Sequence, residues 1–368
     1  MMSMASRRYD IDWLRVIAIG LLLIYHVAIG FQSWGVMIGF ITNDMPWASL
    51  WIPMSMLNIW RIPFLFFVSG MGIYFSMQHR TWKQLMQERT IRILLPYIFG
   101  MFCIFPISVL IWQYYYNWEL NYTYNAGHLW FLGNIFAYVL ILSPLLFFFK
   151  NNEHGKKVTI LKNLLSSPLG LLPVILAFMA EALIVDPNPY ELYAMTWHGF
   201  FLGLIAFFFG FCFVLSGDVF WKMLMKWRWP FVFIGAVLFA LRLFAFDMRS
   251  PTYLLVMESN SWIFSVFGFG YRYLNHSGKT LNYLSQAAYP VYILHMIFLY
   301  LGSMFIFPLD LVPLVKFMLV LIFTFTGCFL LYEFVIRRVN IVRPLFGVKM
   351  KKQKIRQQHV HVGKVIES

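Results

Sequence analysis

The chain has 368 residues, of which 61% are hydrophobic and only 12% are charged, whereas soluble domains are about 45–50% apolar and about 25% charged. This composition excludes a set of soluble domains. The formal net charge of +14 does not indicate nucleic acid, because most of the basic residues lie in alternate loops between long apolar blocks. These blocks are roughly 18–25 residues long, enough to cross a ~30 Å hydrocarbon layer. The sequence therefore predicts an all-α integral membrane protein.

The apolar blocks predict about ten transmembrane helices. In chain order they cover residues 12–33, 57–77, 91–112, 128–149, 169–186, 197–216, 229–247, 254–273, 284–304 and 311–335. The fifth is the shortest and contains Glu181, so counts of eight or nine spans stay open. The first block is too long for the apolar region of a cleavable signal peptide, and we expect it to remain as a helix.

The loops between these blocks alternate in charge. Lysine and arginine concentrate in the loops on one side, and the other loops are acidic or neutral, with Arg249 as the clear exception. Because lysine and arginine are retained on the cytoplasmic side, both termini are predicted to be cytoplasmic. Residues 1–340 then form one transmembrane domain, and residues 341–368 form a basic tail with the composition of a disordered segment. The HVH pair in this tail, His359 and His361, is too small a ligand set to predict a metal site.

The first block, WLRVIAIGLLLIYHV, contains two polar residues, Arg15 and His26. At 100° per residue their spacing brings both to one helix face, roughly 16 Å apart along the axis. Arg15 is expected at the cytoplasmic mouth, where a guanidinium suits phosphate. His26 is expected at mid-membrane or beyond and is a candidate general base, and Asp12 is predicted to orient Arg15 by an i,i+3 ion pair. The alternative is an interfacial anchor and a hydrogen-bonded core histidine, and spacing alone does not choose between these interpretations.

The third span begins with Arg89 and Arg92, three residues apart and therefore neighbours on one helix face. They are expected at the same depth as Arg15. Three arginines at one mouth would form a basic funnel for a polyphosphate. The alternative is that they are ordinary cytoplasmic residues that fix the topology.

The second span places Arg61 near its outer end, against the charge trend, so we expect a partner or a ligand for it. In the same span, Gly70 and Gly72 are predicted to allow close helix packing rather than chemistry. The fourth span opens with His128 and Trp130 at the outer surface. His128 either binds an acceptor or caps the helix, and Trp130 is also typical of a membrane-interface belt.

Later spans contain three further polar residues. Glu181 and Arg242 fall in the outer parts of their spans, and a structural ion pair between them is the simpler interpretation. His295 is expected at mid-membrane in the ninth span, where a satisfied core histidine is favoured over a functional one.

Five segments, in order along the chain, resemble signature patterns of the membrane acyltransferase-3 family. DIDWLRVIAIGLLLIYH is similar to its first-span pattern of an arginine, ten residues and a histidine, here Arg15 and His26. ERTIR resembles its RxxR pair, here Arg89 and Arg92, and FLFFVSGMGIYF, GHLWFL and YPVYILH resemble later patterns. Within the family, WRIPFLFFVSG looks most similar to the glucan-biosynthesis protein C group, whose members are understood to succinylate periplasmic glucans.

The resemblance implies an acyl-CoA-dependent O-acyltransferase in the cytoplasmic (inner) membrane of a bacterium. The donor substrate would be acetyl-CoA or succinyl-CoA, with no bound cofactor, and its phosphates would contact Arg15, Arg89 and Arg92. Its thioester would reach His26, which acts either as general base or as acyl carrier.

The acceptor in this scheme is a hydroxyl of an extracytoplasmic carbohydrate, such as a glucan. It would enter from the outer side near Arg61, His128 and Trp130. The alternative function is a proton-coupled secondary transporter or exporter of an acidic metabolite or polysaccharide, since intramembrane histidine and arginine also occur in carriers. Such carriers often contain inverted repeats, and the sequence has no such symmetry. The oligomeric state stays open.

Overall fold

The computed structural model describes residues 7–351, which form helices joined by short connections and contain no strand. Nine helical segments within these residues are long and apolar enough to cross a membrane, and they are Tyr9–Ile29, Ala48–Met77, Trp82–Tyr115, Gly127–Asn151, Pro168–Val185, Trp197–Leu215, Asp218–Phe244, Lys279–Ile306 and Pro313–Ile336. Each corresponds to one of the ten predicted spans. The predicted all-α membrane fold is confirmed.

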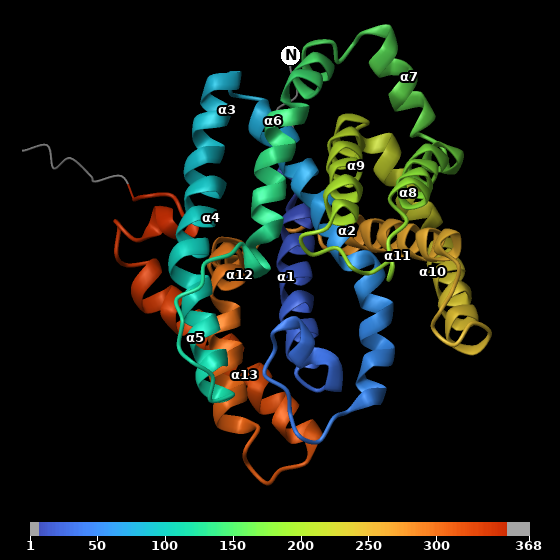
Figure 1. Cartoon of the computed structure of the whole chain (residues 1–368). Helices are drawn as coiled ribbons and strands as arrows, with labels where there is room; N and C mark the ends of the chain where they lie inside the picture. The colour runs from blue at the N-terminus through green and yellow to red at the C-terminus, as the bar shows by residue number, and fades with distance from the viewer. Residues whose placement is uncertain (1–6, 352–368) are drawn as a thin grey trace, which may run out of the picture.

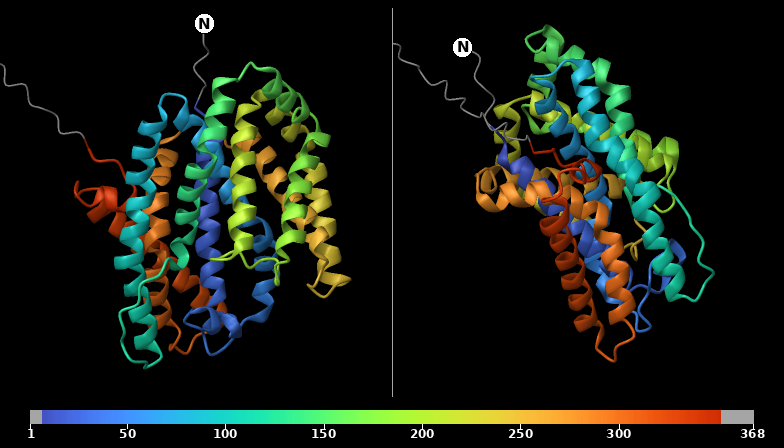
Figure 2. Two further views of the ribbon diagram at one scale, coloured as in Figure 1. Left: turned by 45° about the horizontal axis from the view of Figure 1, so that its top comes forward. Right: turned by 90° about the vertical axis from the view of Figure 1, so that its left-hand side faces the viewer.

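The remaining predicted span, 254–273, forms helix α11 (Thr252–Tyr273). It is not among the nine apolar segments, because its interior contains buried polar residues such as Glu258, Ser259 and Asn260. The helix packs against α10 (Asp218–Phe244) and α2 (Trp51–Met77) and is steeply inclined to the long helices (Figure 2). Its polar side chains therefore face protein instead of lipid.

Helix α1 (Tyr9–Ile29) lies at the centre of the bundle (Figure 1). It packs against α2 on one side and against α12 (Lys279–Ile306) on the other, and it also contacts α11 and α13 (Pro313–Leu331). Segments that are far apart in the sequence thus meet around α1, and the candidate site lies at this meeting point.

The third span is one continuous helical segment with two irregular turns. It consists of α3 (Trp82–Arg89), α4 (Leu95–Phe99) and α5 (Phe105–Tyr115), joined by π-helical turns at Thr90–Leu94 and Gly100–Ile104. A capping box between Thr81 and Gln84 begins α3, because each side chain satisfies a backbone N–H that has no helical partner. The first π turn contains Arg92, and such turns are frequent at functional sites.

Helices α6 (Trp130–Asn151), α7 (Lys156–Leu164), α8 (Leu172–Val185) and α9 (Trp197–Leu215) follow. Close packing of α2 against α9 depends on glycine. A Cβ at Gly70 would lie 1.9 Å from the carbonyl oxygen of Phe207, and a Cβ at Gly210 would lie 2.1 Å from that of Phe67. The predicted packing role of Gly70 is confirmed.

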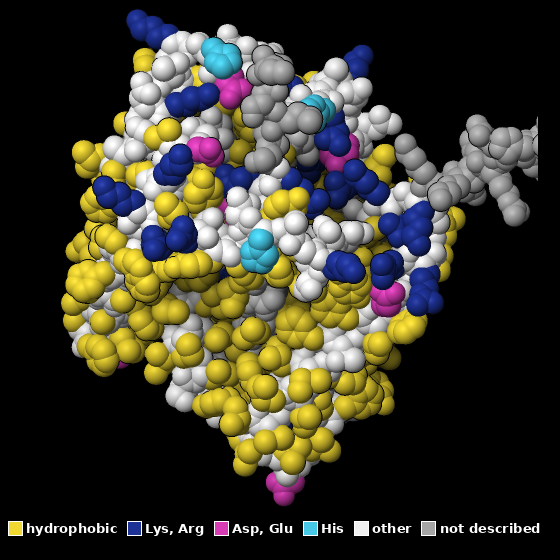
Figure 3. Space-filling view, turned by 180° about the vertical axis from the view of Figure 1, so that it is seen from behind, with side chains coloured by type: hydrophobic (Ala, Val, Ile, Leu, Met, Phe, Trp, Pro, Cys, Tyr) yellow, Lys and Arg dark blue, Asp and Glu magenta, His cyan; other side chains and the backbone are white. Residues whose placement is uncertain are grey.

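Basic side chains gather towards one end of the molecule, and a broad hydrophobic surface covers the remainder of the face in Figure 3. At this end lie the beginning of the described chain, the start of α3 and the connection from α6 to α7 (Figure 1). These are loops for which the sequence predicts a cytoplasmic location.

Residues 341–351 differ from the predicted disordered tail. Arg343, which begins the turn η8 (Arg343–Phe346), is buried and donates hydrogen bonds to two backbone carbonyls at 2.6 and 2.8 Å. Phe346 packs edge-on against Phe99 of α4. The folded region therefore continues past residue 340, because both side chains find partners on it. The remainder of the predicted tail, 352–368, with its HVH pair, lies outside the described residues.

Candidate active site

His26, near the end of α1, faces His295 of α12. The Nδ1 atom of His26 lies 2.8 Å from Nε2 of His295, and the two rings are nearly parallel, at 7°. On its other side, Nδ1 of His295 lies 2.6 Å from the carbonyl oxygen of Tyr292. His295 is fully buried, whereas His26 is partly exposed. His26 is therefore the member of the pair that a substrate can reach.

The contacts of this pair fix where the protons lie when both rings are neutral. A carbonyl oxygen only accepts hydrogen bonds, so Nδ1 of His295 carries the proton and its Nε2 is a lone-pair acceptor. Nδ1 of His26 must then donate to that acceptor. This leaves Nε2 of His26 without a proton, which is the state that a general base requires.

His128, in the turn η5 (Gly127–Leu129), lies against the same pair. Its ring meets that of His295 edge-on with centroids 4.9 Å apart, and its Nε2 lies 3.1 Å from the carbonyl oxygen of Ile293. The Tyr292 hydroxyl donates to the backbone carbonyl of His128. His128, which the sequence predicts on the outer side of the membrane, is half-buried, and these contacts hold it against α12.

Arg61 of α2 completes the cluster. It is only 2% exposed, and its guanidinium carbon lies 3.9 Å from the ring centroid of Tyr25, the residue that precedes His26. Its charge lies within electrostatic range of both His26 and His295. Arg61, which the sequence predicts near the outer end of its span, is thus a buried residue close to the histidines.

Proline fixes the backbone around Arg61. Pro63 has no N–H, so the carbonyl of Ile59 loses its helical partner. Two hydroxyls from other elements donate to that carbonyl instead, Tyr193 at 2.8 Å and Ser259 at 2.9 Å. Tyr193 lies in a loop outside the candidate spans, and burial raises the pKa of its hydroxyl well above the usual value. It therefore remains a donor, and it holds this turn of α2 in place.

At the basic end, Arg15 and Asp12 form the predicted ion pair, with Nη1 and Oδ1 3.3 Å apart. Asp12 also pairs with Arg7 at 3.0 Å. A Cβ atom at position 72 would lie only 3.2 Å from Nη2 of Arg15 and would crowd it. Gly72 therefore leaves room for Arg15, a role different from the expected helix packing.

Arg89 and Arg92 lie beside Arg15, close enough for their charges to interact. Both pair with one carboxylate, Glu88, at 3.1 and 2.9 Å. Arg89 also donates to the Ser76 hydroxyl of α2. Cations outnumber anions in this cluster, and the Arg92 side chain is 42% exposed. The arrangement can therefore bind an anion that arrives from the basic end.

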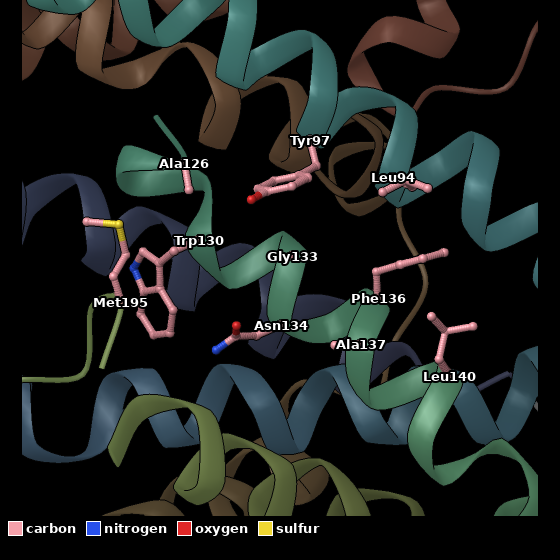
Figure 4. Close-up of a pocket in the computed structure, with 10 residues that line it drawn as sticks. All are labelled: Leu94, Tyr97, Ala126, Trp130, Gly133, Asn134, Phe136, Ala137, Leu140 and Met195. Atoms are coloured by element: carbon pink, nitrogen blue, oxygen red, sulfur yellow. The ribbon is translucent and has the colours of Figure 1, made fainter. Parts of the chain in front are cut away.

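A cavity of about 420 Å³ lies between α4 and α6, close to η5 (Figure 4). Its polar lining groups come from Tyr97, Trp130 and Asn134, and Gly133 and Ala137 widen it. Trp130, which the sequence predicts on the outer side of the membrane, is mostly buried, at 9% exposure, and lines this cavity.

His295 is a buried, hydrogen-bonded core histidine, as the sequence predicts, but its contact with His26 was not predicted. The predicted ion pair between Glu181 and Arg242 is wrong. Glu181 contacts His198 at 3.0 Å. Arg242 pairs with Glu258 at 3.0 Å and with Glu191 at 3.4 Å. The YPVYILH segment was the one signal that could have identified His295. Within residues 7–351, no group of three or more histidine, cysteine or acidic residues could hold a metal ion.

A histidine pair and a cluster of arginines lie near opposite ends of α1, inside a bundle of membrane-length helices, so the fold and site are those of a polytopic membrane protein. A family model described as an acyltransferase domain matches residues 8–333. No curated protein and no solved structure matches the chain. The chain therefore belongs to the acyltransferase-3 family, and it is a membrane acyltransferase.

Proposed function

We propose that this protein is an acyl-CoA-dependent O-acyltransferase that carries an acyl group, acetyl or succinyl, from the cytoplasm to a carbohydrate hydroxyl outside the membrane. One observation carries this proposal: Arg15 and the reactive edge of His26 lie on the same uninterrupted helix, eleven residues apart. At about 1.5 Å per residue this separation is roughly 16 Å, which matches the reach of the pantetheine arm of coenzyme A.

The donor would bind at the basic end. Its phosphates would contact Arg15, Arg89 and Arg92, whose forked donors suit phosphate oxygens. Asp12 and Glu88 hold these guanidiniums in position. The basic end would then be cytoplasmic, with both termini on that side, in the cytoplasmic membrane of a bacterium.

The acceptor would approach from the opposite side, past His128 and Trp130, with the cavity between α4 and α6 as its path (Figure 4). The Nε2 lone pair of His26 would take the hydroxyl proton as the oxygen attacks the thioester carbon. The resulting imidazolium would still donate from Nδ1 to His295, which stabilises it. Alternatively, Nε2 would first accept the acyl group itself and pass it to the hydroxyl. A glucan is the proposed acceptor.

The proposal is tested in inverted membrane vesicles, whose cytoplasmic face is outside. Labelled acetyl-CoA or succinyl-CoA is added outside, and a soluble glucan is enclosed inside. We expect labelled glucan inside and an equal amount of free CoA outside. Right-side-out vesicles with the glucan outside and acyl-CoA added to the same medium should not react, which also tests the orientation. Movement of free solute without CoA release would favour a proton-coupled carrier and overturn the proposal.

A further inference from the structure

Arg61 is a buried cation for which residues 7–351 provide no counterion. Among residues 7–351 no carboxylate forms an ion pair with it, and its Nε and Nη1 atoms have no hydrogen-bond partner. Its Nη2 atom donates a long, weak hydrogen bond to the side-chain oxygen of Asn58, at 3.5 Å. Because a guanidinium stays charged in proteins, an isolated one inside the membrane is costly, and such residues are usually functional.

A second buried arginine of the same protein, Arg242, is held in a different way. Arg242 is 1% exposed, and two carboxylates, Glu258 and Glu191, compensate its charge. A carbonyl oxygen, that of Ser55, accepts a further bond from it. Within the described part of the chain, Arg61 has no carboxylate partner and donates to no backbone carbonyl, although Tyr193 and Ser259 hold the backbone around it. The difference indicates that the counterion of Arg61 arrives with the substrate or forms during the reaction.

The position of Arg61 indicates which negative charge serves as its counterion. The guanidinium lies over the ring of Tyr25, whose neighbour His26 is the proposed base, and its charge reaches both members of the histidine pair. When a hydroxyl attacks a thioester, negative charge develops on the carbonyl oxygen. Fixed donors aimed at that oxygen in a site from which water is excluded give one of the largest single contributions to such catalysis.

We propose that Arg61 stabilises the oxyanion of the tetrahedral intermediate in acyl transfer, an assignment that rests on the proposed function. The hydroxyl oxygen forms a bond to the carbonyl carbon, the hydroxyl proton goes to Nε2 of His26, and the carbonyl electron pair moves onto oxygen opposite Arg61. The intermediate then collapses, the carbon–sulfur bond breaks, and the His26 proton goes to the departing thiolate. The products are CoA thiol and the acyl ester, and His26 is neutral again.

The test compares Arg61→Met and Arg61→Lys with the wild type in the vesicle assay. We expect Arg61→Met to lower kcat by roughly 100- to 1000-fold with acyl-CoA KM nearly unchanged, and to the same extent for acetyl-CoA and succinyl-CoA. Arg61→Lys keeps a charge and should retain more activity. Arg338→Met, at an exposed arginine outside this cluster, is the control and should keep the wild-type kcat. Thermal unfolding of each detergent-solubilised variant separates a folding defect from a catalytic one. If Arg61→Met does not fold, Arg61→Gln replaces it as the uncharged variant, and its kcat is compared with that of Arg61→Lys.

Each contrary outcome has a distinct meaning. Full kcat in Arg61→Met overturns the assignment while the wild type still supports the proposed function. A loss confined to succinyl-CoA also overturns it, because Arg61 would then bind the acyl carboxylate. Raised KM with unchanged kcat would make Arg61 a donor-binding group. If the wild type releases no CoA and labels no glucan, the proposed function itself fails, and the assignment fails with it.

Discussion

Nδ1 of His26 on α1 lies 2.8 Å from Nε2 of His295 on α12, and these residues are 269 positions apart in the sequence. The backbone carbonyl of Tyr292 sets the direction of this contact, because it requires a donor from His295. As a result, when both rings are neutral, no proton lies on Nε2 of His26, the more exposed of the two histidines. The proposed role of His26 as a base therefore depends on a partner that contacts it only in the folded bundle.

Removing the base should abolish acyl transfer. We expect His26→Ala to lower kcat by at least about 100- to 10,000-fold, the usual contribution of general acid–base catalysis, with acyl-CoA still bound. The measurement is CoA release together with binding of labelled acyl-CoA to the detergent-solubilised protein. Full transfer by this variant would exclude His26 as base and as acyl carrier.

Removing the positioning partner should have a smaller effect. A hydrogen bond to a charged group contributes about 1.5–3 kcal/mol, so we expect His295→Phe to lower kcat by roughly 10- to 100-fold, with little change in KM. His295→Gln retains a side-chain acceptor and should recover part of that loss. If both variants lose activity equally although they unfold at the wild-type temperature, the acceptor role of His295 is wrong.

Changes in the arginine cluster should affect the reaction with acyl-CoA but not the reaction with acyl-pantetheine. We expect Arg15→Leu and Arg89→Leu each to raise the KM for acyl-CoA by roughly 10- to 100-fold, because each removes a charged hydrogen bond. The reaction with acyl-pantetheine, which lacks the nucleotide phosphates, should not change. Arg338→Ala is the matched control, since this arginine is 61% exposed and lies outside the cluster. An equal effect on both donors would mean that these arginines do not contact phosphate.

The contact between α2 and α9 should be intolerant of a methyl group. Gly70→Ala places a carbon 1.9 Å from a backbone oxygen, and overpacking of this kind destabilises by about 1–3 kcal/mol. Gly20→Ala on α1 is the control, because nothing lies within 4 Å of a Cβ there. Thermal unfolding in detergent should show a lower Tm for Gly70→Ala alone, and identical Tm values for the two variants would contradict the packing.

Several features followed from local sequence. Helices form where an apolar stretch satisfies its own backbone hydrogen bonds in lipid, so all ten predicted blocks are helical. The Asp12–Arg15 pair is an i,i+3 contact within one helix, and helical periodicity suffices to predict it. The presence of Arg15 and His26 on one continuous helix was predictable for the same reason.

The partners across helices depended on tertiary structure. Arg242 contacts Glu258 and Glu191 instead of Glu181, and His295 meets His26, because the rotation and neighbours of each helix decide which side chains face one another. Periodicity gives the face of a helix but not what lies opposite. The sequence by itself determined the spans, the class of protein and the residues at the two ends of α1. Only the packing of α1, α2 and α12 decided that His26 has an imidazole partner and that no carboxylate among residues 7–351 pairs with Arg61.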